Sequence, residues 1–153
     1  ESLSQKLCSL GQELMLKTLA DLDRLQKNAI LQSDELSTYA AKISKDEARI
    51  NWLSDSAFIE RQVRAFNPSP VAYTSINGVR VKIFSAKESK EEKGNAGEII
   101  KLDKEGVLVG TKTKAIRIRE LQLNQGKGKI LKEADIQNGW SHIFSCGKAF
   151  DQP

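Results

Sequence analysis

Hydrophobic and polar residues follow two different rhythms along this 153-residue chain. Near its start, leucines recur every three or four positions, at Leu3, Leu7, Leu10 and Leu14. That spacing places them on one side of an α-helix, so we predict a terminal helix within residues 1–30. A single amphipathic helix cannot cover its own apolar stripe, and we expect its partner surface to belong to a domain outside this chain.

The apolar period then weakens, and residues 31–54 have the polar character of a linker. Within this stretch Ser44 and Glu47 have the spacing of a helix-capping box and predict one short helix. Residues 55–66 regain an apolar side through Val63 and Phe66, which predicts a second helix. Pro68 ends it, because proline lacks the amide donor that a helix requires.

Beyond Val71 the pattern changes to alternation, which is typical of β-strands with one wet face. Val79, Val81 and Ile83 alternate with Arg80 and Lys82, directly after the hairpin dipeptide Asn77-Gly78. The same reasoning predicts further strands over residues 97–103, 107–111 and 115–123, a charged loop over 87–95 and a short helix over 133–138.

The strand over residues 115–123 contains a change of phase. Ile116 and Ile118 face one way and Arg117 and Arg119 the other, whereas Leu121 and Leu123 are displaced by one position. A β-bulge near Arg119 would return both leucines to the core, and bulges are typical of the corners of small barrels. We therefore predict an α+β chain in which amino-terminal helices and a linker precede a small OB-like antiparallel β-barrel over residues 55–153.

Composition excludes several classes of protein. Charged residues make up 29% and hydrophobic residues 39% of the chain, which fits a folded soluble protein, and no apolar run reaches the roughly 20 residues that cross a bilayer. Cys8 and Cys146 lack metal-like spacing, and we interpret them as thiols in a reducing compartment. His142 is the only histidine, so we predict a structural role for it and no metal site.

Positive charge is concentrated in the second half of the chain. Residues 112–132 hold seven Lys or Arg and one Glu, enough to attract a polyanion, although a solvated surface is the alternative. Arg80 and Lys82 share the wet face of one predicted strand, and a Gly126-x-Gly128 loop could approach a phosphate closely. The candidate phosphate contacts are Arg80, Lys82, Lys112, Lys114, Arg117, Arg119, Lys127, Lys129 and Lys132, with Lys42, Lys45 and Arg49 in the linker.

Aromatic side chains offer a second way to bind nucleic acid, by stacking on unpaired bases. Phe66 and Phe144 fall within apolar patterns and are predicted to lie in the core, and Trp52 is predicted to anchor the linker against the barrel. Tyr73, Trp140 and Phe150 remain open as stacking candidates.

The run from Arg61 to Pro70, R-Q-V-R-A-F-N-P-S-P, resembles the R-A-F-N-P-W-P signature of the methionyl-tRNA formyltransferase family. Ser69 replaces the family's usual tryptophan, and Val71 lies where glycine is common. The resemblance extends to Leu7–Gly11, Thr18-Leu19, Thr38–Ile43, Lys45–Trp52, Ala96–Ile99 and Leu121–Lys129. Formyl-tetrahydrofolate dehydrogenase and an aminosugar formyltransferase share the central motif, but the basic region favours the tRNA enzymes.

The resemblance implies that a formyl group is transferred from 10-formyltetrahydrofolate, as co-substrate, to methionyl-initiator-tRNA. It implies that residues 1–30 are the last helix of a catalytic domain, that residues 55–153 bind tRNA, and that the cations named above are the contacts. The family's Asn-x-His motif does not occur here, so we expect no catalytic residues, no bound cofactor and no activity in this chain alone. We also expect a cytoplasmic monomer that does not bind membranes. The alternatives are the carboxy-terminal domain of another folate-dependent formyltransferase and an OB-fold binder of single strands.

Overall fold

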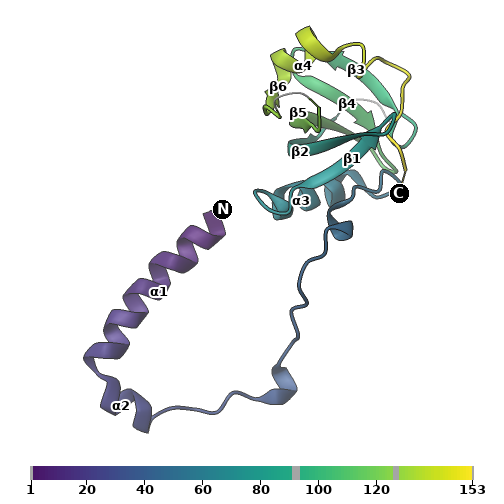
Figure 1. Ribbon diagram of the computed structural model, residues 1–153. Coiled ribbons are helices and arrows are strands. Elements are labelled where there is room, and N and C mark those ends of the chain that lie inside the picture. Colours follow the sequence, from purple (N-terminus) through teal and green to yellow (C-terminus); the bar gives the residue numbers. More distant parts are fainter. Residues whose placement is uncertain (1, 91–93, 126–127, 153) are drawn as a thin grey trace. The chain divides into compact units, whose positions relative to one another are not determined.

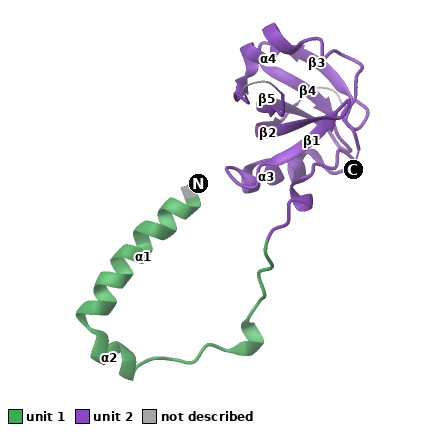
Figure 2. Ribbon diagram, viewed as in Figure 1, with its two compact units in different colours: residues 1–42 green, residues 43–153 purple. Residues whose placement is uncertain are grey.

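The computed structural model describes residues 2–90, 94–125 and 128–152, which form two compact units, 1–42 and 43–153 (Figures 1 and 2). The division falls inside the predicted linker. Residues on its carboxyl side join the second unit, where Ala48, Ile50 and Trp52 are buried.

The first unit contains helices α1 (Ser2–Ala20) and α2 (Leu22–Lys27), followed by a short 3₁₀ helix, η1 (Asp34–Leu36). The predicted terminal helix is thus interrupted by a turn at Asp21. Thr18 Oγ1 donates a hydrogen bond to the carbonyl of Leu14 four residues earlier, a contact that often bends helices. The leucines of the α1 stripe are all exposed within this unit.

The second unit begins with the predicted capping box. The backbone N–H of Ser44 donates to Glu47 Oε1 at 2.7 Å, and the N–H of Glu47 donates to Ser44 Oγ at 3.3 Å. The Ser44 N–H, and second its side chain, hydrogen-bond to the Glu47 carboxyl and lower its pKa, and the reciprocal bonds stabilise the 3₁₀ helix η2 (Asp46–Ala48). The short helix predicted in the linker is therefore confirmed.

Helix α3 (Ser56–Phe66) follows, within one residue of the predicted bounds. Ile59 and Val63, four residues apart, are buried against the sheet and explain why this segment is helical. The helix ends at Asn67, whose Nδ2 donates to the carbonyl of Phe84, and the peptide bonds preceding Pro68 and Pro70 are both cis.

An antiparallel sheet forms the body of this unit. Its strands are β1 (Ala72–Ile76), β2 (Val79–Glu88), β3 (Ile99–Asp103), β4 (Gly106–Gly110), β5 (Ala115–Leu123) and β6 (Leu131–Lys132). The spatial order is β1-β2-β5-β4-β3, with β6 beside β5 (Figure 1). Asn77 and Gly78 both have positive φ and form the predicted tight turn between β1 and β2. Helix α4 (Glu133–Trp140) covers the predicted short helix.

The predicted bulge in β5 is confirmed. Ile83 pairs with Leu121, but Ala86 pairs with Ile118, so the register shifts between these two pairs and leaves Arg119 without a partner in the β2 ladder. Because of this shift Ile116, Ile118, Leu121 and Leu123 are all buried. The strand therefore contributes four apolar side chains to one core.

The sheet is not closed, so the predicted OB-like barrel is not confirmed, although the α+β class is. The C-terminal strap, residues 147–152, lies between the two edge strands and hydrogen-bonds to both. On the β3 side, the N–H of Ile99 donates to the Lys148 carbonyl at 2.7 Å and the N–H of Phe150 donates to the Gly97 carbonyl at 2.9 Å. On the β1 side, the N–H of Asp151 donates to the Ser75 carbonyl at 2.8 Å. The strap thus covers edges that a barrel would pair directly.

Trp52, which was predicted to anchor the linker, is buried in the core of the second unit and also contacts this strap. Its ring is fully buried and stacks on Phe150 with centroids 5.1 Å apart, while its Nε1 donates to Thr74 Oγ1 at 3.0 Å. A buried indole N–H is costly without a partner, so Thr74 makes this burial possible.

Candidate nucleic-acid interface

Three polar side chains form a row across adjacent strands of the sheet. Tyr73 of β1 pairs with Lys82 of β2, and Lys82 pairs with Gln122 of β5. Their neighbours Thr74, Val81 and Leu123 are buried on the opposite face, because side chains alternate along a strand. The register therefore places the row on the outer face of the sheet.

Arg80 lies on the same face, and its guanidinium carbon is 3.6 Å from the centre of the Tyr73 ring. This cation–π contact fixes an otherwise flexible side chain. Arg80 and Lys82 are both exposed, in agreement with the predicted wet face of this strand.

Two recesses adjoin this row and share Lys82 in their linings. The first has a volume of about 300 Å³ and is lined by Lys45, Ala48, Ser69, Pro70, Val71, Tyr73, Arg80 and Lys82. The second has a volume of about 230 Å³ and is lined by Lys82, Gln122, Leu123, Asn124, Gln125 and Gly128. We call the two recesses together the basic groove. Among the residues that the structure describes, no carboxylate lines it.

Val71, in the wall of the first recess, has a strained backbone. Its φ is +69°, a conformation that a β-branched residue rarely adopts. This position is where glycine is common in the family that the sequence resembles, and the conformation explains that preference. Strained residues cluster at binding sites. The strain at Val71 therefore adds to the cations that line this recess as a reason to regard it as a candidate binding site.

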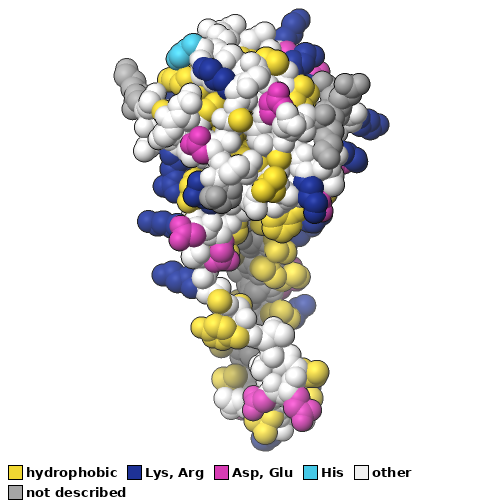
Figure 3. All heavy atoms as spheres, turned by 90° about the vertical axis from the view of Figure 1, so that its right-hand side faces the viewer, with side chains coloured by type: hydrophobic (Ala, Val, Ile, Leu, Met, Phe, Trp, Pro, Cys, Tyr) yellow, Lys and Arg dark blue, Asp and Glu magenta, His cyan; other side chains and the backbone are white. Residues whose placement is uncertain are grey.

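Four other predicted contacts lie beside carboxylates. The ion-pair distances are 4.0 Å for Lys112–Asp55, 2.7 Å for Lys114–Glu88, 3.7 Å for Lys129–Asp135 and 4.0 Å for Lys132–Glu120. All four lysines are exposed, but each neighbouring carboxylate reduces the field that a phosphate would experience. In the view of Figure 3, Lys and Arg side chains are interspersed with Asp and Glu rather than gathered in one block.

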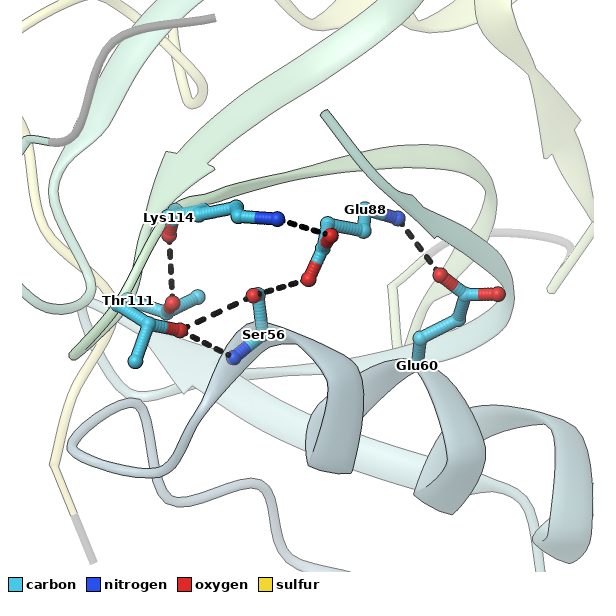
Figure 4. A network of polar contacts seen from close by, with 6 residues as sticks. Ser56, Glu60, Glu88, Thr111 and Lys114 are labelled. Carbon is cyan, nitrogen blue, oxygen red and sulfur yellow. Dashed lines mark hydrogen bonds and ion pairs between the residues drawn. The ribbon is translucent and has the colours of Figure 1, made fainter. Parts of the chain in front are cut away.

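Lys114 belongs to a polar network that fastens α3 to the sheet (Figure 4). Glu88 accepts from Lys114 Nζ at 2.7 Å and from Ser56 Oγ at 2.6 Å, and its own N–H donates to Glu60 Oε2 at 2.8 Å. The hydrogen bonds from Lys114 and Ser56 lower the pKa of Glu88 and outweigh the opposing effect of burial. We assign Lys114 a role in stability on this basis.

Arg117 does not lie on a wet face, so this expectation from the strand pattern is wrong. Its side chain is only 5% exposed, with Nη1 2.7 Å from Asp103 Oδ1 and Nε 3.5 Å from Glu105 Oε2. Burial acts to raise the pKa of Asp103, but hydrogen bonds from Lys101 and from the Glu105 N–H, with the charges of Arg117 and Lys101, together lower it. Arg117 therefore stabilises the β3–β4 turn from within.

The remaining predicted contacts are dispersed. Arg119 is exposed at the bulge, outside the basic groove, and Lys42 belongs to the first unit. Arg49 is half-buried and donates from Nη2 to the Gln152 carbonyl at 2.8 Å. Lys127 and Gly126 lie outside the described residues.

The structure thus brings together Lys45, Arg80 and Lys82, and it adds Gln122, whose place beside Lys82 depends on strand register.

The aromatic stacking candidates are mostly unavailable. Trp52, Phe144 and Phe150 are buried. Trp140 and His142 stack on each other, with centroids 5.9 Å apart, at the end of α4. Tyr73 faces the basic groove, but Arg80 covers its ring.

The described parts of the chain contain no cluster of metal-ligating side chains. Within those parts, no group of three or more His, Cys, Asp or Glu side chains could hold a metal ion. None of the helices described there has the length and hydrophobicity of a membrane span. Cys8 and Cys146 are both free and exposed.

A family model described as the formyl transferase C-terminal domain matches residues 42–139. Methionyl-tRNA formyltransferases from Pseudomonas putida (strain W619) and Pseudomonas fluorescens (strain SBW25) are 37% and 38% identical to the chain, over 99% and 95% of its length. The chain spans about half the length of these relatives, 48% and 45%. HypX from Aquifex aeolicus, solved with tetrahydrofolic acid, has the same fold over 84% of this chain and 23% of its own, with a TM-score of 0.64 and 24% identity.

Proposed function

The chain belongs to the formyl transferase C-terminal domain family, and on this premise we propose that it is the tRNA-holding portion of a methionyl-tRNA formyltransferase. The parent enzyme would transfer a formyl group from 10-formyltetrahydrofolate to the methionyl amine of initiator tRNA, in the cytoplasm, during translation initiation. The names of the relatives and the basic groove support this proposal.

The chemistry itself would take place on other residues of the parent enzyme. The amine must attack as the free base, and the resulting oxyanion and proton each need a partner. The Asn-x-His motif that supplies part of this machinery in the family does not occur in this sequence. We therefore expect the 153-residue chain to bind tRNA without formylating it.

The basic groove would contribute by positioning. Lys45, Arg80 and Lys82 place three cations around one recess without a carboxylate among its described lining residues. Contacts to phosphate add affinity and fix the orientation of a nucleic acid without reading its sequence. A tRNA held in this way delivers its acceptor end to a distant site, which lowers the entropic part of the barrier.

The observation that carries the proposal is the convergence of these three cations, and charge removal tests it. Lys45→Gln, Arg80→Gln and Lys82→Gln each remove one charge, and Lys104→Gln, at the exposed β3–β4 turn, is the matched control. Measured against initiator tRNA, each groove variant should reduce the slope of log affinity against log salt by up to about 0.9 for a duplex contact.

Lys104→Gln should leave the slope unchanged. Equal slopes for all four variants and the unaltered chain would contradict the proposal. A full-length relative carrying the same groove substitutions should lose affinity for tRNA while retaining its affinity for the folate co-substrate.

A further inference from the structure

We propose that the end of the C-terminal strap holds the last part of the linker, residues 44–50, against the sheet. The point about which the preceding chain can turn then lies before Ser44 and not next to Trp52. This proposal goes beyond the proposed function and does not depend on what the basic groove binds. It derives from hydrogen bonds that join the linker, the strap and one edge of the sheet.

The free edge of β1 receives both segments. Arg49 pairs with Tyr73 in parallel, and the Ile50 N–H donates to the Tyr73 carbonyl at 2.8 Å. Two residues further along β1, the Ser75 carbonyl accepts from the Asp151 N–H at 2.8 Å. Carbonyls two residues apart on a strand point to the same side. The linker and the strap therefore meet one sheet edge next to each other.

The two segments also contact each other directly. Arg49 Nη2 donates to the Gln152 carbonyl at 2.8 Å, and in Figure 1 the yellow strap ends beside the segment that leads into α3. A charged donor makes this bond stronger than a neutral one. Gln152 Nε2 in turn donates to the Ala96 carbonyl at 3.1 Å. Gln152 thus connects the linker, through the strap, to the loop that precedes β3.

Helix α3 holds the same stretch of linker from its other side. Gln62 Nε2 donates to the carbonyl of Glu47 at 2.9 Å and to that of Arg49 at 3.2 Å. We call Arg49, Gln62, Asp151 and Gln152, with the carbonyls that they contact, the latch.

The part of the linker before the latch is different in kind. Residues 37–43 are all exposed and belong to no helix or strand, and the boundary between the two compact units falls at 42/43. Hinges are a few residues that absorb changes in φ and ψ. With the latch closed, we expect this stretch to absorb them, and the capping box at Ser44 to mark its end.

Opening the latch need not unfold the unit. Ile50 and Trp52 are fully buried, but residues 44–47 are exposed and the only buried side chain between them and Ile50 that is apolar is that of Ala48. Segments with few buried apolar contacts open at a lower free energy than the core. The latch should therefore open locally, and the linker and the strap should open together.

Hydrogen exchange measured by mass spectrometry on the 153-residue chain tests this coupling from both sides. Arg49→Met removes the donor and keeps an unbranched side chain. We expect exchange to become about tenfold faster in residues 45–50 and also in residues 149–152, because a charged hydrogen bond is lost. Exchange in β4 should not change.

The reciprocal variant is Gln152→Leu, which changes the strap and no atom of the linker. Loss of the neutral bond to Ala96 should make exchange about two- to fivefold faster in residues 45–50 as well as in the strap. Arg64→Met is the matched control, since Arg64 is exposed on α3 and its ion pair with Glu60 is 4.0 Å long. It should alter neither segment.

The outcomes are decisive in either direction. Exchange that accelerates only in the substituted segment, or in neither segment, would overturn the proposal, because the linker and the strap would then be held independently. Acceleration that includes β4 would also overturn it, since the variant would act on the whole unit. None of these results bears on tRNA binding, which the salt slopes of the groove variants test separately.

Discussion

Arg117 Nη1 lies 2.7 Å from Asp103 Oδ1, beneath the surface of the β3–β4 turn. This arginine carries one of the seven positive charges of the basic stretch, yet it is only 5% exposed and is directed at carboxylates. The stretch therefore contains charges of two kinds, one that holds the sheet together and one that is open to a ligand.

Arg117→Gln should therefore lower stability rather than RNA affinity. The substitution removes a charged hydrogen bond, but Asp103 keeps its contacts with Lys101 and the Glu105 N–H, so the free energy of unfolding should fall by about 1–3 kcal/mol. Urea unfolding measures this loss, and the salt dependence of tRNA binding at low temperature should be unaltered. Lys82→Gln should leave the free energy of unfolding unchanged and should reduce the salt dependence of tRNA binding.

The Glu88 network should make stability depend on pH. The pKa of Glu88 is lowered in the folded state, so its stabilising effect is fully present above the unfolded-state value near 4.5 and is lost as the pH falls through the lower folded-state pKa. Glu88→Gln should reduce the urea midpoint at pH 7, and its difference from the unaltered chain should shrink below about pH 4.5. Glu35→Gln, outside the network, is the control; a difference that is constant from pH 7 to pH 3 would show that the network does not titrate in this way.

Two glycines should respond to alanine in opposite directions. A Cβ on Gly110 would lie 2.2 Å from the carbonyl oxygen of Asn95, whereas a Cβ on Gly139 would meet nothing within 4 Å. Gly110→Ala should cost about 3 kcal/mol because backbone atoms must move. Gly139→Ala, within helix α4, should stabilise by up to about 1 kcal/mol. Thermal melting of the two variants side by side checks both signs.

Val71 provides a test of backbone strain. Burial alone predicts that Val71→Ala is less harmful than Val71→Gly, because alanine keeps one more carbon. With φ at +69°, glycine also escapes a penalty of about 1–2 kcal/mol that alanine retains. After the entropy that glycine loses on folding, we expect Val71→Gly to be the more stable variant by about 0.5–1 kcal/mol. The reverse order would mean that this residue is unstrained.

Local signals in the sequence anticipated much of the second unit. The phase change between Ile118 and Leu121 identified the bulge, Asn77-Gly78 identified the hairpin, and Ser44 with Glu47 identified the capping box. Each of these features depends on neighbouring residues, so the sequence contains the information directly.

The candidate site was only partly predictable, because it depends on contacts between distant segments. Alternation placed Arg117 opposite Ile116 and Ile118, but the turn that bears Asp103 and Glu105 covers it. The row of Tyr73, Lys82 and Gln122 similarly follows from strand register, which the three residues do not encode individually. The strap was missed because residues 147–152 lack the alternation of apolar and polar positions that predicts a strand.

The strap also bears on how fast this molecule can fold. Arg49 and Gln152 are hydrogen-bonded although 103 positions separate them, and Trp52 stacks on Phe150 beside them. Closing a loop of this length costs entropy before the contact can stabilise the chain. Contacts between such distant residues therefore form late and slow folding. We therefore expect tryptophan fluorescence from Trp52 to be among the last signals to reach its native value during refolding, after the hairpin between β1 and β2 has formed.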